Sequence, residues 1–168
     1  MPDRKYSFPP VVAPDARLLI LGSLPGERSL AAGRYYAHPQ NQFWHLLSPV
    51  VGEDLAALDY PDRLAALRTA RIGLWDVVAS ATRPGSTDAA LRDIAPHDIA
   101  ALAARLPALR AIAFNGATAH RHGLRQLGDV AARYTIVSLP SSSPLHTIGL
   151  AAKQPAWTGL RTLIADND

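Results

Sequence analysis

A chain of 168 residues, 48% of them hydrophobic and 18% charged, is long enough for one domain with a substantial core and too apolar to be disordered. The absence of cysteine excludes disulfides, thiolate zinc sites and thiolate-held iron–sulfur clusters. The net charge is +3, and all basic residues except Lys5 and Lys153 are arginine, which suits phosphate oxygens and suggests nucleic acid as a partner, although genomic base bias also produces such a composition.

The N-terminal residues 1–14 are proline-rich and predict an extended lead-in to a single domain over residues 15–168. No apolar run reaches the roughly 18 residues that span a bilayer, and the first residues lack the apolar core of a signal peptide. We therefore expect a cytoplasmic protein, in the cytosol or nucleoid of a bacterium or archaeon, without membrane contact.

Short continuous apolar runs alternate with helical patterns along the chain. Strands are predicted at 17–21, 72–79, 109–114 and 134–139, and helices at 40–50, 61–70, 96–106, 117–127 and 154–165. Apolar strands separated by helices are typical of a parallel sheet covered on both faces. The predicted fold class is therefore a three-layer α/β/α architecture with a central four-stranded parallel sheet.

Polar clusters follow each predicted strand. They are the turn Gly22–Gly26, the loop 80–93, Asn115 and the segment Ser141–His146. In a parallel sheet, ligands bind beyond the carboxyl ends of the strands, so these clusters are expected to converge. No pair of histidines and carboxylates has metal-ligand spacing, and we expect neither a metal nor a cofactor.

The segment Ala37–Trp44 concentrates an imidazole, amides and two aromatic rings. A flat nucleobase needs a ring to stack on and amides or hydroxyls to contact its edge. Asn41 could hold a water or touch a sugar, or it could accept backbone N–H groups at a helix start. Phe43 and Trp44 point about 100° apart on a helix; Trp44 is expected in the core and Phe43 is a candidate stacking ring.

The later loops offer further candidates, each with a structural alternative. Asn115 could contact a base edge or cap a loop. Arg83 could touch DNA or pair with Asp88. The second polar loop could hold a phosphate through Ser141, Ser142 and Ser143, with Pro144 stiffening them, and Leu145 could wedge into a base stack or cover the core. His38 and His146 could each assist a developing anion or simply be exposed.

Three motifs together resemble the uracil-DNA glycosylase superfamily. They are Gly22-Ser-Leu-Pro-Gly26, Tyr35-Tyr-Ala-His-Pro-Gln-Asn-Gln-Phe-Trp44 and Ser141-Ser-Ser-Pro144. The chain is most similar to the hypoxanthine-DNA glycosylase branch, also called family 6 or DNA-deoxyinosine glycosylases, from Val11 to about Leu163. The family fold, a four-stranded parallel sheet between helices, agrees with the predicted strands.

The resemblance implies roles for individual residues. Asn41 matches the catalytic asparagine of the branch, and Phe43 matches the aromatic that stacks on the flipped base. The motif Ser141–Pro144 would grip the DNA backbone, with Leu145 as wedge. Many members carry Asp or Asn in the first motif, whereas this chain has Ser23 and Leu24, and Ser141 stands where a histidine is common.

The candidate catalytic residues are Asn41 and Ser23. The candidate base-binding residues are Phe43, Asn115, Leu24 and His38. The candidate DNA-binding residues are Ser141, Ser142, Ser143, Pro144, Leu145, His146 and Arg83.

The resemblance implies a DNA glycosylase that flips out a deaminated base, uracil and/or hypoxanthine, and hydrolyses its glycosidic bond during base excision repair. No lysine lies in the pocket motifs for a Schiff base, so we expect a monofunctional enzyme that leaves an abasic site. We expect a monomer whose partner is DNA containing a deaminated base. The alternative is a non-catalytic module that binds abasic DNA or nucleotides. The sequence does not decide between uracil and hypoxanthine as the preferred base, or between single- and double-stranded DNA as the substrate. It also leaves open which residue positions the water and whether His38 or His146 takes part.

Overall fold

Four parallel strands form the centre of the computed structural model, which describes residues 3–166. They are β2 (Leu18–Gly22), β3 (Ile72–Asp76), β6 (Ala111–Asn115) and β7 (Thr135–Leu139), in the order β3-β2-β6-β7. All residues of β2, β3 and β6 are buried, as expected for apolar strands covered on both faces. The predicted parallel sheet is confirmed.

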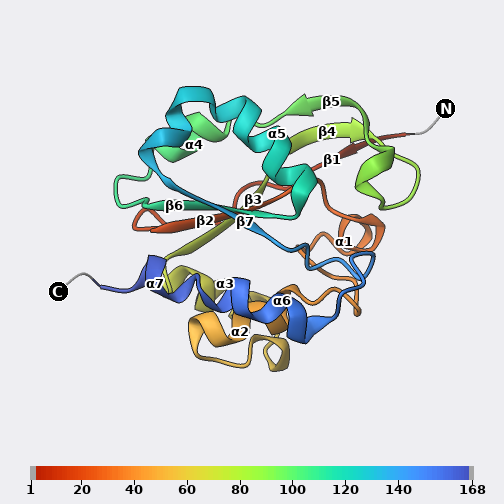
Figure 1. The fold of residues 1–168 in the computed structure, drawn as a ribbon. Helices are drawn as coiled ribbons and strands as arrows, with labels where there is room; N and C mark the ends of the chain where they lie inside the picture. Colours follow the sequence, from red (N-terminus) through yellow and green to blue (C-terminus); the bar gives the residue numbers. More distant parts are fainter. Residues whose placement is uncertain (1–2, 167–168) are drawn as a thin grey trace.

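Helices cover both faces of this sheet (Figure 1). One face carries α2 (Phe43–Val51), α3 (Tyr60–Thr69), α6 (Leu150–Thr158) and α7 (Arg161–Ile164); the other carries α4 (Ile99–Ala104) and α5 (Ala117–Leu127). Strand β2 supplies both cores, because Leu18 and Ile20 pack on one side while Leu19 and Leu21 pack on the other. The protein therefore has the predicted three layers.

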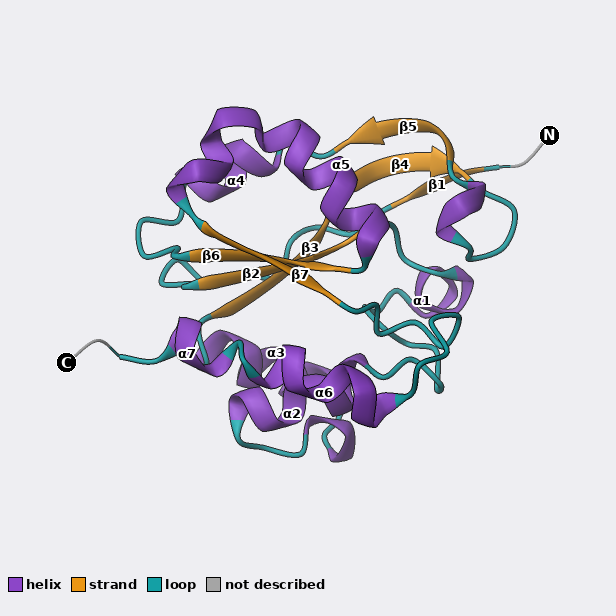
Figure 2. Cartoon of the chain, in the orientation of Figure 1, coloured by secondary structure: helices purple, strands orange, loops and turns teal. Residues whose placement is uncertain are grey.

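A second, antiparallel sheet lies beside the first and was not predicted (Figure 2). It consists of β1 (Arg4–Tyr6), β4 (Val78–Thr82) and β5 (Arg92–Pro96), in the order β1-β4-β5. These strands are short, and the β4–β5 pairing is interrupted by register shifts, so their pattern in the sequence is weak. Part of the expected lead-in 1–14 is thus a sheet strand; its residues 1 and 2, and residues 167 and 168 of the expected domain, lie outside the described part.

Several element boundaries differ from the predicted ones. The helix expected at 40–50 begins at Phe43, and the helix expected at 154–165 is two helices, α6 and α7. The remaining helices are short: α1 (Glu27–Ala32) and the 3-10 turns η1 (Leu55–Ala57), η2 (Asp88–Ala90) and η3 (Gly128–Arg133). Within residues 3–166, no helix has the length and apolar character required to cross a membrane.

Candidate functional site

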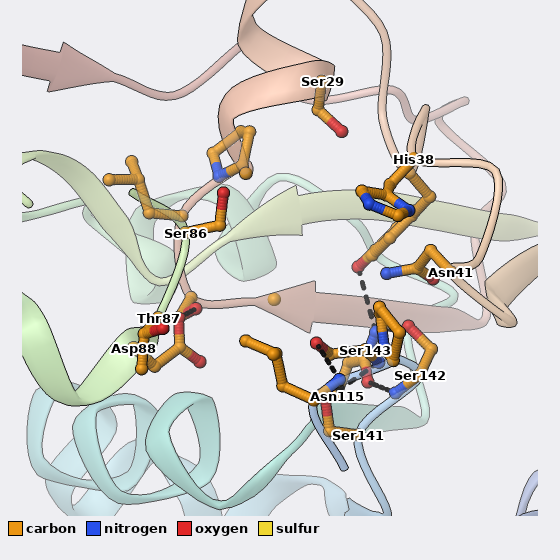
Figure 3. A pocket seen from close by; sticks show the side chains of 18 of the residues that line it. Ser29, His38, Asn41, Ser86, Thr87, Asp88, Asn115, Ser141, Ser142 and Ser143 are labelled. Carbon is orange, nitrogen blue, oxygen red and sulfur yellow. Dashed lines mark hydrogen bonds between the residues drawn. The ribbon is translucent and has the colours of Figure 1, made fainter. Parts of the chain in front are cut away.

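A cavity of about 440 Å³ opens at the carboxyl edge of the central sheet (Figure 3). Its walls come from the residues that end β2, β3 and β6, namely Gly22, Asp76 and Asn115, and from the loop that follows β7. Parallel strands bring their carboxyl ends to the same edge, which explains why loops far apart in the sequence meet here. Its volume falls within the range of small-ligand pockets.

The guanidinium of Arg83 is buried and is hydrogen-bonded to the main chain of the first motif, Gly22–Gly26. It is 1% exposed and donates hydrogen bonds to the carbonyl oxygens of Leu24, Pro25 and Gly85. It also lies 3.9 Å from a carboxylate oxygen of Asp88. The expectation that Arg83 contacts DNA is therefore wrong for this structure, because its guanidinium is buried and already donates to main-chain carbonyls.

Ser23 lines the cavity and is paired with a carboxylate. Its hydroxyl donates to Oδ1 of Asp88 over 2.7 Å, and Asp88 also lines the cavity. Burial raises the pKa of Asp88 above its usual value, whereas the hydrogen bond from Ser23 and the charge of Arg83 act in the opposite direction. The neighbouring Leu24 lines the cavity as well, and it packs in a small apolar cluster with Val78.

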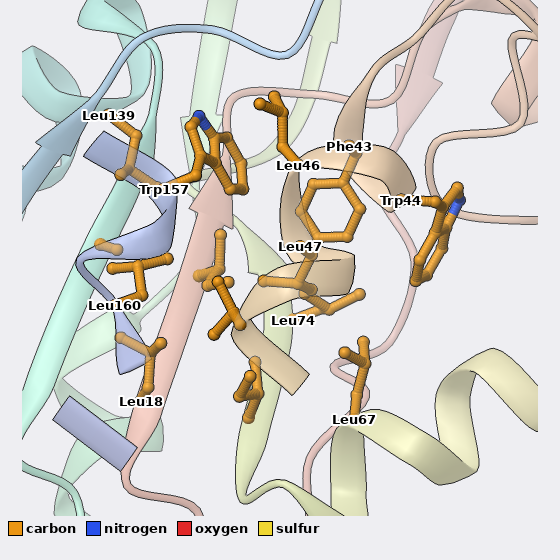
Figure 4. Packing of buried hydrophobic residues seen from close by; sticks show 14 of the residues in the cluster. Leu18, Phe43, Trp44, Leu46, Leu47, Leu67, Leu74, Leu139, Trp157 and Leu160 are labelled. Atoms are coloured by element: carbon orange, nitrogen blue, oxygen red, sulfur yellow. The ribbon is translucent and has the colours of Figure 1, made fainter. Parts of the chain in front are cut away.

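The ring of Phe43 does not line the cavity. It is fully buried in the core, edge-on to both Trp44 and Trp157 (Figure 4), and the ring of Tyr36 stacks on it with centroids 3.8 Å apart. The expectation that Phe43 stacks on a base is therefore corrected: it begins helix α2 with its side chain turned into the core. Trp44 is buried, as expected.

Tyr36 is the ring that faces the cavity. It lines the cavity and covers Phe43, and its main-chain oxygen accepts a hydrogen bond from the Trp44 indole. Its φ of 54° lies in the left-handed region, which is uncommon for a bulky residue and frequent at functional sites. The sequence contained a signal for this ring, because Tyr35 and Tyr36 precede the histidine of the motif. Spacing alone does not show, however, which aromatic ring of the motif is buried and which lines the cavity.

Asn41 combines the two alternatives that its position left open. Its Oδ1 accepts the backbone N–H of Phe43 over 3.0 Å at the start of α2, while the side chain lines the cavity (Figure 3). No hydrogen bond to its amide nitrogen is formed by the described residues, so this donor remains for a ligand. His38 also lines the cavity, and its Nδ1 accepts the backbone N–H of Gln40.

Asn115 and Ser142 both line the cavity and are hydrogen-bonded to each other. Asn115 donates from its amide nitrogen to the hydroxyls of Ser142 and Tyr36, and its Oδ1 accepts the backbone N–H of Ser142. Both donors of this amide are therefore occupied in this structure, while Asn115 also lines the cavity, so its contact with a base stays a prediction. Ser142 is 1% exposed, which corrects its expected contact with DNA.

The rest of the second loop is held by short-range hydrogen bonds and is partly exposed. The hydroxyl of Ser141 accepts the N–H of Ser143, and the hydroxyl of Ser143 accepts the N–H of Leu145. Leu145 is 64% exposed and His146 is exposed beside it. Together with Pro144, these four residues line the cavity, and their contact with DNA stays a prediction.

Asp76 is a cavity residue that sequence reasoning missed. It ends β3, is 3% exposed, and accepts a hydrogen bond from the Ser7 hydroxyl over 2.8 Å. Burial raises the pKa of its carboxyl to about 7, against the opposing effect of Ser7. A side chain at Gly22 would place its Cβ 2.8 Å from Oδ1 of Asp76 and 3.1 Å from the Tyr36 hydroxyl, so only glycine fits there. A carboxylate at a buried strand end was the available signal.

Among residues 3–166, no three histidine or acidic side chains are grouped as ligands for a metal ion. The polar groups of the cavity include amides, hydroxyls, imidazoles and the three carboxylates of Glu27, Asp76 and Asp88. Such a set can contact the edge of a planar heterocycle, stack it on a tyrosine ring and order a water molecule.

Comparison with known proteins supports a specific relationship. The family model described as the uracil DNA glycosylase superfamily matches residues 9–161. Proteins named hypoxanthine DNA glycosylase from Methanosarcina barkeri and Methanosarcina acetivorans are 37% and 40% identical to this chain. These alignments cover 92% and 91% of this chain and 96% and 95% of the relatives. A solution NMR structure from Methanosarcina acetivorans, described provisionally as a uracil DNA glycosylase, superposes with a TM-score of 0.83 at 36% identity and covers 96% of this chain and 99% of its own.

Proposed function

This chain belongs to the uracil-DNA glycosylase superfamily, and on that premise we propose that it is a DNA glycosylase that removes a deaminated base from DNA. The base is extruded from the helix, its glycosidic bond is hydrolysed, and an abasic site remains. We place hypoxanthine first among the substrates because both sequence relatives carry that base in their names, with uracil as the second candidate. The enzyme acts in base excision repair.

One observation carries this proposal: the tyrosine ring of Tyr36 and the free amide donor of Asn41 line the same cavity at the sheet edge. A flipped base needs a flat partner, and base–aromatic stacking tolerates any base. The donor groups of the cavity meet the carbonyl that deamination leaves on the base. A base that pairs weakly also costs less free energy to extrude.

The chemistry is a hydrolysis in which the sugar becomes cationic and the base leaves with negative charge. Stabilisation of these charges and placement of one water supply most of the rate. The amide nitrogen of Asn41 donates toward the departing base or the water, and the helix α2 that its Oδ1 caps holds it in place. No lysine lines the cavity, which favours a monofunctional enzyme over one that forms a Schiff base.

The exposed second loop is proposed to hold the DNA. The hydroxyls of Ser141 and Ser143 donate to phosphate, and Leu145 fills the space that the extruded base vacates. His38 and His146 also line the cavity, and we propose that they contact the base or its phosphates. We propose that the protein acts as a monomer wherever the chromosome lies, in the cytosol or nucleoid of its cell.

The test is excision from labelled duplexes that carry one hypoxanthine, uracil or xanthine, followed by alkali. The wild-type protein is expected to produce an alkali-labile site, fastest at hypoxanthine. Asn41→Ser keeps a side-chain oxygen for the helix start but removes the amide, so it should bind DNA and lose about 10²-fold or more in excision rate. Asn41→Ala should lose the same rate and some stability.

Two outcomes would contradict the proposal. A band shift without strand scission at any of the three bases would mean a binding module on the same fold. A rate of Asn41→Ser equal to that of the wild type would remove Asn41 from the mechanism.

A further inference from the structure

The first motif has no carboxylate of its own, yet a carboxylate stands beside it. Within Gly22–Gly26 the only side chain able to donate or accept a hydrogen bond is that of Ser23, and its hydroxyl is committed to Asp88 over 2.7 Å. Asp88 is the first residue of η2, in the loop that follows β4 of the second sheet. The second sheet thus brings an acid into a cavity that the central sheet builds.

We propose that Asp88 is the general base of the reaction: it takes a proton from the water that attacks the sugar, while Ser23 holds it in position. This inference rests on the glycosylase function proposed above. It assigns the water-activating group that the first motif of this chain lacks.

The two oxygens of Asp88 have different surroundings. Oδ1 accepts the Ser23 hydroxyl and lies 3.9 Å from the Arg83 guanidinium. Oδ2 has no hydrogen-bond partner among the described residues, and the side chain is 40% exposed, so a water can reach it. Burial raises the pKa of Asp88, and the hydrogen bond from Ser23 and the positive charge of the buried Arg83 act in the opposite direction. One oxygen is therefore anchored and the other is free to accept a proton.

The position of Asp88 also suits this step. In Figure 3, Asp88 and Asn41 lie on opposite sides of the cavity. A base that rests near Tyr36 and Asn41 would leave its sugar between that wall and Asp88. Water would then approach the sugar carbon from the face opposite to the one from which the base leaves.

The step balances without any further reactant. The water oxygen forms a bond to the sugar C1′ as the bond from C1′ to the base nitrogen breaks, and the electron pair of that bond leaves with the base. The water proton moves to Oδ2 of Asp88 and then to the base or to solvent, which restores the carboxylate. Before the bond forms, the negative charge of Asp88 stabilises the cationic sugar.

Two other carboxylates line the cavity, and both are less suited to the same task. The carboxylate of Glu27 is paired with the ammonium of Lys5. Asp76 is almost fully buried, its Oδ2 accepts the Ser7 hydroxyl, and its Oδ1 points to the space above Gly22. Burial raises its pKa to about 7, so near neutral pH it is only partly ionised. Asp88, unlike Asp76, has an oxygen without a hydrogen-bond partner on a side chain that is 40% exposed, and unlike Glu27 it is held by Ser23 rather than by a lysine.

The decisive variant is Asp88→Asn, which keeps the shape and an oxygen that can accept from Ser23 but removes the basicity. Single-turnover excision of hypoxanthine, with enzyme in excess, should slow by about 10²–10⁴-fold, the usual contribution of general base catalysis. Binding to a duplex with a stable abasic-site analogue should change by less than about threefold, because no phosphate contact is removed. The wild-type rate should fall as pH drops and Asp88 is protonated, and this acid limb should vanish in Asp88→Asn.

Two further variants keep the result interpretable. Asp62→Asn makes the same chemical change at an exposed position on α3, remote from the cavity, and should leave the rate unchanged. Asp88→Ala opens space where formate can act as a small external base, so added formate should restore part of its rate if the folded variant has lost only a proton acceptor.

The outcomes separate the two proposals. Wild-type excision with an undiminished rate in Asp88→Asn would overturn the role of Asp88 and leave the glycosylase function intact. A slowed Asp88→Asn that keeps the acid limb, or an Asp88→Ala that formate does not rescue, would reduce Asp88 to a support for Ser23 and overturn the inference. Failure of the wild type to release any base would overturn the proposed function itself, and the role of Asp88 with it.

Discussion

The rings of Tyr36 and Phe43 are stacked, with centroids 3.8 Å apart and planes inclined by 9°. Phe43 is fully buried and Tyr36 lines the cavity, so the two rings form a wall of which only the tyrosine reaches a ligand. Stacked aromatic pairs gain free energy beyond burial alone, which steadies the outer ring. A firm outer ring is what a flipped base needs, since a mobile one would have to be ordered on binding.

Replacement of the outer ring should affect excision, and replacement of the inner ring should affect stability. Tyr36→Ala should lower kcat/KM about 10- to 100-fold, because base–aromatic stacking contributes roughly 1–3 kcal/mol. Tyr36→Phe keeps the ring and should retain most of the activity. Phe43→Leu should lower the melting temperature with a smaller change in kcat/KM. Steady-state kinetics and thermal denaturation measure both effects; an excision defect larger in Phe43→Leu than in Tyr36→Ala would contradict this assignment.

The buried Arg83 should behave as a structural residue. Arg83→Met leaves three carbonyl oxygens and Asp88 without their cation, and we expect a loss of about 2–4 kcal/mol in the free energy of unfolding. Urea denaturation measures this loss. The slope of log affinity for DNA against log salt concentration should stay the same, since a phosphate contact would add nearly one unit to that slope. A reduced slope would mean that Arg83 meets DNA after all.

Asp76 should make stability fall as pH rises. Its pKa is about 7 in the folded protein and near the ordinary value of 3.8 when unfolded, so between these values the folded state binds more protons. The free energy of unfolding therefore decreases from about pH 4 to about pH 7 as far as this group is concerned. Asp76→Asn removes the effect. The free energy of unfolding of the variant minus that of the wild type should therefore be larger at pH 8 than at pH 5. Equal differences at the two pH values, measured by urea denaturation, would contradict the raised pKa.

Leu145 should matter only when a base must be pulled from a duplex. It is 64% exposed, so Leu145→Ala should leave the free energy of unfolding within about 0.5 kcal/mol of the wild type. Excision from double-stranded DNA should slow severalfold, because the wedge that replaces the extruded base is gone. Excision from single-stranded DNA, where no stack must be opened, serves as the internal control. Equal slowing on both substrates would argue against a wedge.

The position of the site followed from the sequence. Four apolar runs that alternate with helical patterns predict a parallel sheet, and polar clusters after those runs predict a cavity at its carboxyl edge. The chain forms both, because strand direction and burial are encoded locally in continuous apolar runs. The second sheet was missed, since β1, β4 and β5 are short and none of them is a continuous apolar run.

Local pattern thus determined which segments meet, whereas the tertiary structure decided which side chains reach the cavity. Nothing in the spacing distinguishes the buried ring of Phe43 from the accessible ring of Tyr36, or an arginine that meets DNA from Arg83, which is buried against main-chain carbonyls. The pairing of Ser23 with Asp88 spans 65 positions of the chain. Such outcomes depend on packing and hydrogen bonding between distant segments, and these arise only when the two sheets are assembled.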